Sequence, residues 1–223
     1  MAAPAPEHVR NIVLVGQDGA GKTSLAEAML FVSGKTPRMG TTHDGKSYLD
    51  YDPEEIKRKF TISTSIAPIP YKDYKINVLD TSGHPDFIGD TLDMAASAGF
   101  EDVLLVGHVG KLCKLAGGIM NTHSHTADCR TELFCTHAAL CGASRETCRA
   151  LFEAATTDAC LDLLDAAGLR APVLESLLAA VQLHLDRRAA GAFRVGAILF
   201  SNQHGPLGQT ETAAQILNDW KER

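Results

Sequence analysis

The sequence predicts an α/β protein, because short apolar strands and helical segments share the same chain. With 223 residues, 45% hydrophobic and 22% charged, the chain has the composition of a globular protein and room for one large or two small domains. Apolar runs that end at a glycine indicate buried strands, and helices mixed with such strands indicate parallel pairing. The motifs change near residue 87, so we expect one domain at 9–87 and another at 88–223, after a disordered tail at 1–8.

The first domain is expected to contain a strand, a helix and a hairpin. Residues 11–15 form a short apolar run, and residues 22–32 have the apolar spacing of a helix. Residues 60–70 and 74–79 flank Lys72-Asp73, which predicts a β-hairpin. The intervening residues 33–58 are polar and rich in glycine, so we expect a loop there.

The second domain is expected to be rich in helices around two buried strands. The apolar runs 103–106 and 195–200 predict the strands. Apolar periodicity and an abundance of Ala and Leu predict helices over 87–97, 127–141, 144–156, 158–167, 173–190 and 212–221.

Residues 16–23 form a candidate phosphate-binding loop. They read Gly-Gln-Asp-Gly-Ala-Gly-Lys-Thr and fit G-x-x-x-x-G-K-[ST], between a predicted strand and a predicted helix. Lys22 would neutralise β- and γ-phosphate charge, and the Thr23 hydroxyl would ligate Mg²⁺. The remaining candidate nucleotide-binding residues of this loop are Gly16, Asp18, Gly19, Ala20 and Gly21. A glycine-rich turn without a ligand is the alternative interpretation.

A second candidate element begins where the hairpin ends. Asp80 stands at the end of a strand, where a carboxylate beside a phosphate loop is suited to hold Mg²⁺, often through water. Gly83 permits close approach of the backbone to a γ-phosphate. His84 taken alone reads equally well as an ordinary loop histidine, but the pairing of this element with the loop at 16–23 is specific.

Residues 9–88 resemble the N-terminal GTP-binding domain of translational GTPases, most closely the elongation factor G group. The resemblance rests on residues 16–23, on Arg58-Lys-Phe-Thr61-Ile and on Asp80-Thr-Ser-Gly-His84. It implies a partial P-loop GTPase lobe that binds GTP with Mg²⁺. By this resemblance Thr61 joins Thr23 and Asp80 at the metal, and His84 is the catalytic residue that positions the attacking water.

The same resemblance has gaps that limit the expected function. The Asn-Lys-x-Asp segment with which the family reads guanine does not occur in the sequence, so base specificity is not predicted. The ribosome-binding domains of the family have no counterpart here, and we therefore expect no contact with the ribosome.

A second group of polar residues follows the predicted strand at 103–106. Ligands of open α/β sheets bind at the carboxyl ends of strands. Lys111 and Lys114 lie three apart, so they are expected to share one helix face and to pair with ligand carboxylates. The candidate substrate- and cofactor-binding residues are Gly107, His108, Gly110, Lys111, Lys114, Thr122, His123, Ser124, Asp128 and Arg130.

Two alternatives to a ligand site remain open for this segment. One is a solvated helix with incidental lysines. The other is a metal site, although the spacing is not C-x-x-C; its ligands would come from His123, His125, Cys129, Cys135 and His137.

Residues 87–223 resemble the C-terminal part of the cobalt-precorrin-5B C1-methyltransferases of anaerobic cobalamin biosynthesis. The resemblance is strongest at 87–95, at 103–130 and at 197–205. It implies a Rossmann-like, helix-rich α/β lobe that acts in transferring a methyl group from S-adenosylmethionine to C1 of a cobalt corrinoid. The acetate and propionate arms of that substrate suit Lys111, Lys114 and Arg130. A GTP-binding fragment and an inactive chimeric fusion are the alternative functions, because the GTPase segment replaces the N-terminal portion of the methyltransferase family.

Charge and composition argue against several other classes of protein. The net charge of −6 argues against a general DNA-binding surface, which needs an excess of basic residues. No apolar run is long enough to span a bilayer, and residues 1–10 lack the apolar stretch of a signal peptide. We therefore expect a cytoplasmic protein without membrane partners, whose 6 cysteines are free thiols.

Overall fold

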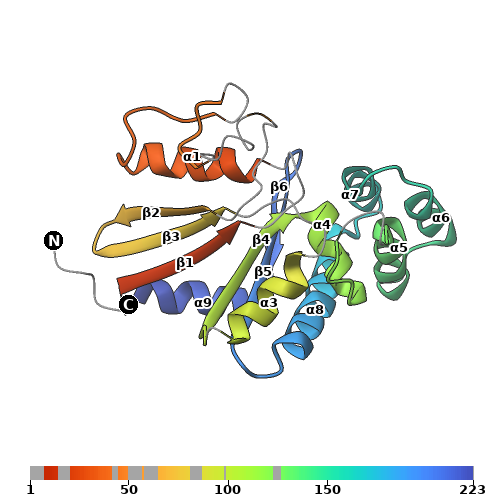
Figure 1. Ribbon diagram of the computed structural model, residues 1–223. Coiled ribbons are helices and arrows are strands. Elements are labelled where there is room, and N and C mark those ends of the chain that lie inside the picture. The colour runs from red at the N-terminus through yellow and green to blue at the C-terminus, as the bar shows by residue number, and fades with distance from the viewer. Residues whose placement is uncertain are drawn as a thin grey trace. The chain divides into compact units, whose positions relative to one another are not determined.

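The computed structural model describes residues 8–14, 21–41, 45–49, 57, 65–80, 87–97, 99–122 and 127–222. These residues combine helices with two three-stranded sheets, so the α/β prediction is confirmed (Figure 1). The chain divides into two compact units, Met1–Pro85 and Asp86–Arg223, called unit 1 and unit 2 below. No helix within the described ranges is both long enough and apolar enough to cross a membrane.

The described residues of unit 1 include a three-stranded sheet and the helix α1. The strands are β1 (Val9–Leu14), β2 (Ser65–Tyr71) and β3 (Tyr74–Asp80), in the order β1-β3-β2, and the helix is α1 (Lys22–Val32). β1 pairs with β3 in parallel, and β2 and β3 form the predicted hairpin. The hairpin turns at Lys72, whose φ of 51° lies in the left-handed region. Residues 60–64, predicted to extend its first strand, lie outside the described residues.

The core of unit 1 forms between α1 and one face of the sheet. Alternate residues of β2 point inward, as expected of a strand with one buried face. The buried apolar residues of this core are Ala26, Leu30, Leu49, Ala67, Ile69 and Val78.

Unit 2 contains a second three-stranded sheet. The strands β4 (Asp102–His108) and β5 (Arg194–Ser201) are parallel, and β6 (Gly205–Gln209) is antiparallel to β5. Both predicted strands are confirmed, but β6 was not predicted. Its sequence contains Pro206 and two glycines, which disfavour strands, and it forms at the sheet edge, where proline is tolerated.

Helices make up most of unit 2. They are α3 (Phe87–Ser97), α4 (Val109–Leu112), the 3₁₀ helix η2 (Cys113–Gly117), α5 (Arg130–Leu140), α6 (Arg145–Phe152), α7 (Thr157–Ala166), α8 (Arg170–Ala189) and α9 (Glu211–Glu222). Every predicted helix of this unit is found; α3 has the predicted bounds, and the ends of the others are shifted. α6 ends earlier than predicted because Thr156 already caps α7 by accepting a hydrogen bond from Ala159 N. α8 begins before Pro172, which the first turn of a helix tolerates.

Packing against β5 holds α8 and α9 in place. In α8, Val173, Leu177, Val181 and Leu185 recur every four residues and are fully buried, so they form one apolar stripe. On α9, Ala213 approaches β5 at Gly196, where a Cβ would lie only 2.4 Å from the Ala213 nitrogen. Gly196 is therefore required for this helix to pack so close to the strand.

A network of charged groups fastens the amino ends of β4 and β5. Arg194 donates two hydrogen bonds to Asp102, of 2.7 Å from Nε and 3.0 Å from Nη2, and a third of 2.7 Å to Asp219 on α9. The Trp220 indole also donates to Asp102, at 3.3 Å. The side chain of Asp102 is only 8% exposed, whereas that of Arg194 is 42% exposed. The buried Asp102 carboxylate therefore receives most of its hydrogen bonds from Arg194.

We predict that Arg194→Ala lowers the free energy of unfolding of unit 2 by about 1–2 kcal/mol, because it leaves a buried carboxylate short of donors. The matched control is Arg188→Ala, whose ion pair with Asp93 joins side chains that are 39% and 61% exposed. Exposed pairs contribute about 0–1 kcal/mol. Urea unfolding followed by the fluorescence of Trp220, the single tryptophan, measures both. Equal losses of unfolding free energy in the two variants would contradict the stabilising role assigned to Arg194.

Candidate functional site

The first candidate site lies at the carboxyl edge of the sheet of unit 1. In the parallel pair, Leu14 at the end of β1 stands opposite Asp80 at the end of β3. Asp80 is therefore at the edge from which the chain enters the 16–23 segment, and its side chain is fully buried. This is the position predicted for a carboxylate that serves a bound metal.

The described part of the loop consists of Gly21, Lys22 and Thr23. Gly21 has φ 83°, in the left-handed region, and α1 begins at the next residue. Lys22 and Thr23 are the first two residues of this 11-residue helix, and the amino end of a helix favours an anion. The remaining predicted residues, which lie outside the described part of the chain, are Gly16, Asp18, Gly19, Ala20, Thr61, Gly83 and His84.

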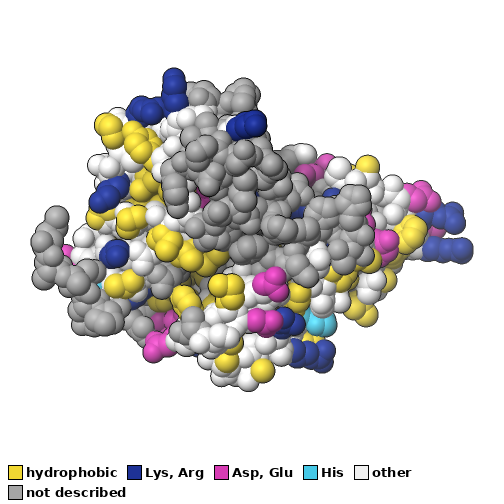
Figure 2. Space-filling model, in the orientation of Figure 1, with side chains coloured by type: hydrophobic (Ala, Val, Ile, Leu, Met, Phe, Trp, Pro, Cys, Tyr) yellow, Lys and Arg dark blue, Asp and Glu magenta, His cyan; other side chains and the backbone are white. Residues whose placement is uncertain are grey.

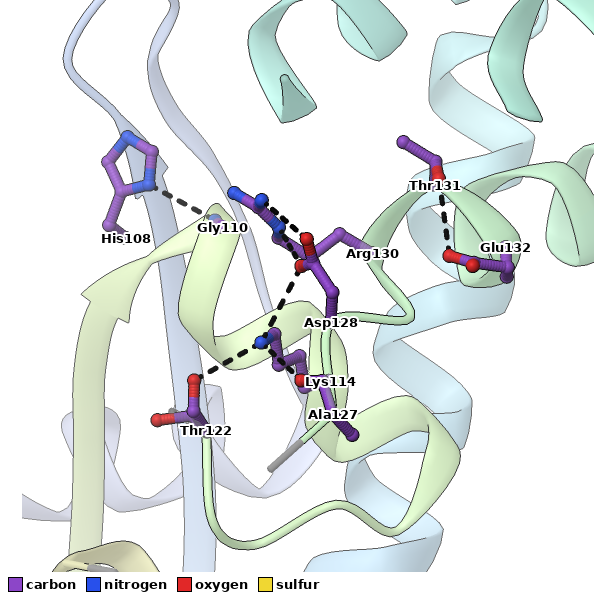
Figure 3. Close-up of polar contacts among 9 residues, drawn as sticks. All are labelled: His108, Gly110, Lys114, Thr122, Ala127, Asp128, Arg130, Thr131 and Glu132. Carbon is purple, nitrogen blue, oxygen red and sulfur yellow. Dashed lines mark hydrogen bonds and ion pairs between the residues drawn. The ribbon is translucent and has the colours of Figure 1, made fainter. Parts of the chain in front are cut away.

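The second candidate site lies at the carboxyl edge of β4 and β5 in unit 2. His108 ends β4 opposite Phe200 of β5, and the two rings meet edge to face with centroids 5.8 Å apart. The His108 Nδ1 accepts a hydrogen bond of 3.1 Å from Gly110 N and so caps α4 (Figure 3). This contact places the proton of a neutral ring on Nε2.

Gly107 and Gly110 make the turn after β4 compact. A Cβ on Gly107 would come within 3.0 Å of Leu112. A Cβ on Gly110 would lie 3.2 Å from the His108 ring and 3.3 Å from the Thr157 hydroxyl. These two predicted site residues therefore act, in this structure, by allowing close packing.

The ammonium of Lys114 forms hydrogen bonds with backbone carbonyl groups of the chain. Its side chain is 1% exposed, and the ammonium donates to the carbonyl oxygens of Thr122, at 3.2 Å, and Ala127, at 2.6 Å (Figure 3). It also lies 3.7 Å from an oxygen of Asp128. We expected Lys114 to face ligand carboxylates beside Lys111, but a buried ammonium needs fixed partners, and here the chain supplies them. Lys114 thereby ties together the two ends of the 122–127 segment.

Lys111 and Arg130 bring further positive charge to the same edge. Burial and then the neighbouring Lys114 and Arg130 lower the pKa of Lys111, with Asp128 acting in the opposite direction. Arg130 makes a bidentate pair with Asp128, at 2.5 Å from Nε and 2.9 Å from Nη2, and this pair lowers the pKa of Asp128. Three cations thus gather around one carboxylate, which is a favourable field for a further anion.

Ser201 and His204, which were not among the predicted site residues, also lie at the carboxyl end of β5. Ser201, at the end of β5, donates to Asp158 of α7 at 2.5 Å and accepts from Gln203 N and His204 N at 3.0 and 3.2 Å. His204 Nε2 in turn lies 3.4 Å from Asp162. The sequence signal was the polar Ser201-Asn-Gln-His204 turn, but its partners on α7 are remote along the chain.

The alternative metal site receives no support from the part of the chain that is described. There, no group of three or more His, Cys, Asp or Glu side chains could hold a metal ion. The ring of His137 is buried beside Ser176, with Nδ1 2.8 Å from the hydroxyl, and burial lowers its pKa. Ser124 and the proposed ligands His123 and His125 lie among the residues not described.

We predict that Lys114→Met destabilises unit 2 by about 2–3 kcal/mol, because two carbonyl groups lose their donor while the length of the side chain is kept. The control is Lys111→Met on the adjacent turn, which should cost less than about 1 kcal/mol because this lysine is only partly buried. Urea unfolding at pH 7 distinguishes the two. Similar losses in both variants would show that Lys114 has no special structural role.

Comparison with known proteins separates the two regions of the chain. Residues 7–114 match the family model of the elongation factor Tu GTP binding domain, and residues 121–211 match that of the CbiD C-terminal domain. The first match extends into unit 2 as far as residue 114. A helix followed by an apolar strand, as in α3 and β4, suits either α/β family.

Individual relatives show the same division. A cobalt-precorrin-5B C(1)-methyltransferase of Ruminiclostridium cellulolyticum is 45% identical over 55% of this chain and 32% of its own length. The mitochondrial ribosome-releasing factor 2 of Debaryomyces hansenii is 45% identical over 37% of this chain and 10% of its own length. An elongation factor G-like protein of Synechocystis is 34% identical over 52% of this chain and 17% of its own length.

The chain thus spans about a third of the methyltransferase relative and less than a fifth of the translation-factor relatives. The chain joins two regions that are similar to different families. One is similar to the GTP-binding domain of translation factors, and the other is similar to the C-terminal domain of CbiD.

Proposed function

We propose that unit 2 binds the acidic arms of a cobalt corrinoid and acts in its C1-methylation, with S-adenosylmethionine as the methyl donor. The observation that carries this proposal is the gathering of Lys111, Lys114 and Arg130 around Asp128, next to the end of β4. The similarity of this region to cobalt-precorrin-5B methyltransferases supports the same substrate class.

The cations have different roles in this proposal. Lys111 and Arg130, which are partly exposed, pair with carboxylates of the substrate. Lys114 and the His108 cap hold the backbone that carries them. S-adenosylmethionine, when bound, would supply the methyl group through attack of C1 of the macrocycle on its methyl carbon, with the neutral thioether as the leaving group. Fixing several arms at once orients C1 for that attack, and orientation contributes strongly to rate.

Binding of a corrinoid with free carboxylate arms should weaken about tenfold, or about 1.4 kcal/mol, in Lys111→Gln, because one cation facing a carboxylate is lost. The control is Lys221→Gln, which removes the same charge from α9, the helix whose Asp219 binds Arg194 at the opposite edge of the sheet. Titration calorimetry with the acidic corrinoid and with its amidated form makes the comparison. Equal affinity for the two forms, or equal loss in the two variants, would refute charge pairing at this edge.

The affinity should also depend on pH in a defined direction. An anionic ligand favours the charged form of Lys111, and the pKa of this lysine is lowered from its ordinary value of 10.5. Binding is therefore strongest below the lowered pKa and weakens as the pH rises through it. In Lys111→Gln this part of the pH dependence should disappear, because no group is left to titrate at that position.

A second candidate function belongs to unit 1, for which we propose binding of a nucleoside triphosphate with Mg²⁺. The specific observation is that left-handed Gly21 leads into Lys22 and Thr23 at the start of α1, and that Asp80 ends the strand paired with β1. Lys22 would bind the phosphates, while Thr23 and Asp80 would hold the metal. Without an Asn-Lys-x-Asp segment, GTP and ATP should bind within about tenfold of each other.

We expect Lys22→Ala to abolish triphosphate binding, because a donor and a positive charge beside the β- and γ-phosphates are lost. Lys35→Ala, which removes an exposed lysine beyond the end of α1, should bind as the wild type does. A fluorescent nucleotide titration in Mg²⁺ buffer measures both. Tight binding that survives Lys22→Ala would exclude the loop as the site, and a protein that binds neither nucleotide nor corrinoid would be the inactive fusion.

A further inference from the structure

Two cysteines lie at similar heights on the packed helices α5 and α6. α5 ends at Leu140 and α6 begins at Arg145, so a short turn joins the two helices, which pack against each other. Cys135 lies five residues before the end of α5, and Cys148 lies three residues after the start of α6. At about 1.5 Å per residue, these positions are about 7.5 Å and about 4.5 Å along each helix from the turn. The two residues are therefore close to level across the helix pair.

Hydrogen bonds fix the turn that joins α5 to α6. Ala143 N donates to the carbonyl oxygen of Ala138 at 2.9 Å, which closes the end of α5. Gly142 has φ 84°, in the left-handed region where glycine is favoured. Ser144 then caps α6 by accepting a hydrogen bond of 3.1 Å from Thr147 N. The arrangement of the two helices is therefore set locally.

The thiols of the two cysteines are in contact, and both side chains are only partly buried. The two thiols share a hydrogen bond. The Sγ of Cys148 also lies 4.0 Å from the carbonyl oxygen of Ala143 in the turn. Burial, and then the charge and the hydrogen bond of Cys148, raise the pKa of Cys135. The thiol of Cys135 therefore stays protonated near neutral pH and donates to the sulfur of Cys148.

Two other cysteines of unit 2 are less suited to react. Cys160 of α7 is fully buried, its Sγ donates to the carbonyl oxygen of Leu151 at 3.8 Å, and burial raises its pKa to about 11. Burial also raises the pKa of Cys113 to about 12. Thiols react as thiolates, so cysteines buried in this way are inert. Contact with a second thiol and access to solvent coincide at Cys135 and Cys148.

We propose that Cys135 and Cys148 form a redox modification site that closes reversibly to a disulfide between α5 and α6, with a peroxide as the oxidant. This site requires neither of the ligands proposed above. Because α5 begins at Arg130, the bond would fasten the helix that carries this residue of the candidate site to α6.

The reaction needs only the two thiols and the peroxide. The thiolate of Cys148 attacks one peroxide oxygen and the O–O bond breaks, which leaves a sulfenic acid on Cys148. The proton that the thiol gave up completes the first water. The sulfur of Cys135 then attacks the sulfur of Cys148, the S–O bond breaks, and the thiol proton of Cys135 leaves with the oxygen as a second water. The two sulfurs together lose two electrons to the peroxide, and exchange with reduced glutathione reverses the bond.

The test treats the full chain with hydrogen peroxide, blocks the remaining thiols by alkylation, and maps disulfides by mass spectrometry of unreduced tryptic peptides. Cleavage at Arg130, Arg145 and Arg149 places Cys135 in peptide 131–145 and Cys148 in peptide 146–149. In the wild type these two peptides should become linked, and reduced glutathione should release them. Cys135→Ser and Cys148→Ser should each lower the yield of the linked pair at least about tenfold, because disulfide geometry is specific.

Cys141→Ser is the matched control. Cys141 is also partly buried, and it shares peptide 131–145 with Cys135. Its replacement should leave the yield of the linked pair unchanged, which shows that the bond to peptide 146–149 comes from Cys135.

The outcomes decide between a built pair and incidental oxidation. A linked pair that both single variants lose and that Cys141→Ser retains supports the proposal. Persistence of the link in Cys135→Ser, or its loss in Cys141→Ser, overturns it. The wild type decides even where a variant folds poorly, since sulfinic and sulfonic acids without a link, or links between separate molecules alone, also overturn the proposal.

Discussion

Parallel pairing between strands that are remote in sequence determines where both candidate sites lie. In unit 2 the register runs from Asp102 opposite Arg194 to His108 opposite Phe200. Parallel strands need a long crossover, and here it carries the helices from α4 to α8. In unit 1 the pairing of β1 with β3 places Leu14, the last residue of β1, opposite Asp80. In each unit the polar residues of interest follow the carboxyl ends of paired strands, where open α/β sheets bind ligands.

Buried charges serve the same physical purpose in both units. Glu27 accepts from backbone N–H groups of one polar segment, and Lys114 donates to backbone carbonyls at the two ends of another. A buried charged group is costly unless it is fully hydrogen-bonded, so each defines one arrangement of its segment. Figure 2 draws one face of the molecule, on which Lys and Arg side chains form several small groups, some of them beside acidic side chains.

The sequence was informative where a local pattern determines structure. Apolar runs predicted β1, β4 and β5, periodicity predicted the helices, and the Gly-Lys-Thr motif predicted a strand-to-helix turn with a glycine before α1. The strand β6 was missed because pairing with β5 overrides its poor propensity. Partners across the fold could not be predicted either. No sequence pattern near Glu27 predicts its hydrogen bonds with Gly40 and Leu49. The spacing of Lys111 and Lys114 does not show that only Lys114 is buried.

The central claim is that this chain carries two separate ligand sites, each at the carboxyl edge of its own sheet. Hydrogen exchange of the intact protein, measured by mass spectrometry with each ligand in turn, tests it most directly. GTP with Mg²⁺ should protect amides in β1, α1 and the end of β3, and the acidic corrinoid should protect those from His108 to Gly117 and around Arg130. Protection by either ligand at the edge assigned to the other, or no protection at either edge, would contradict the account.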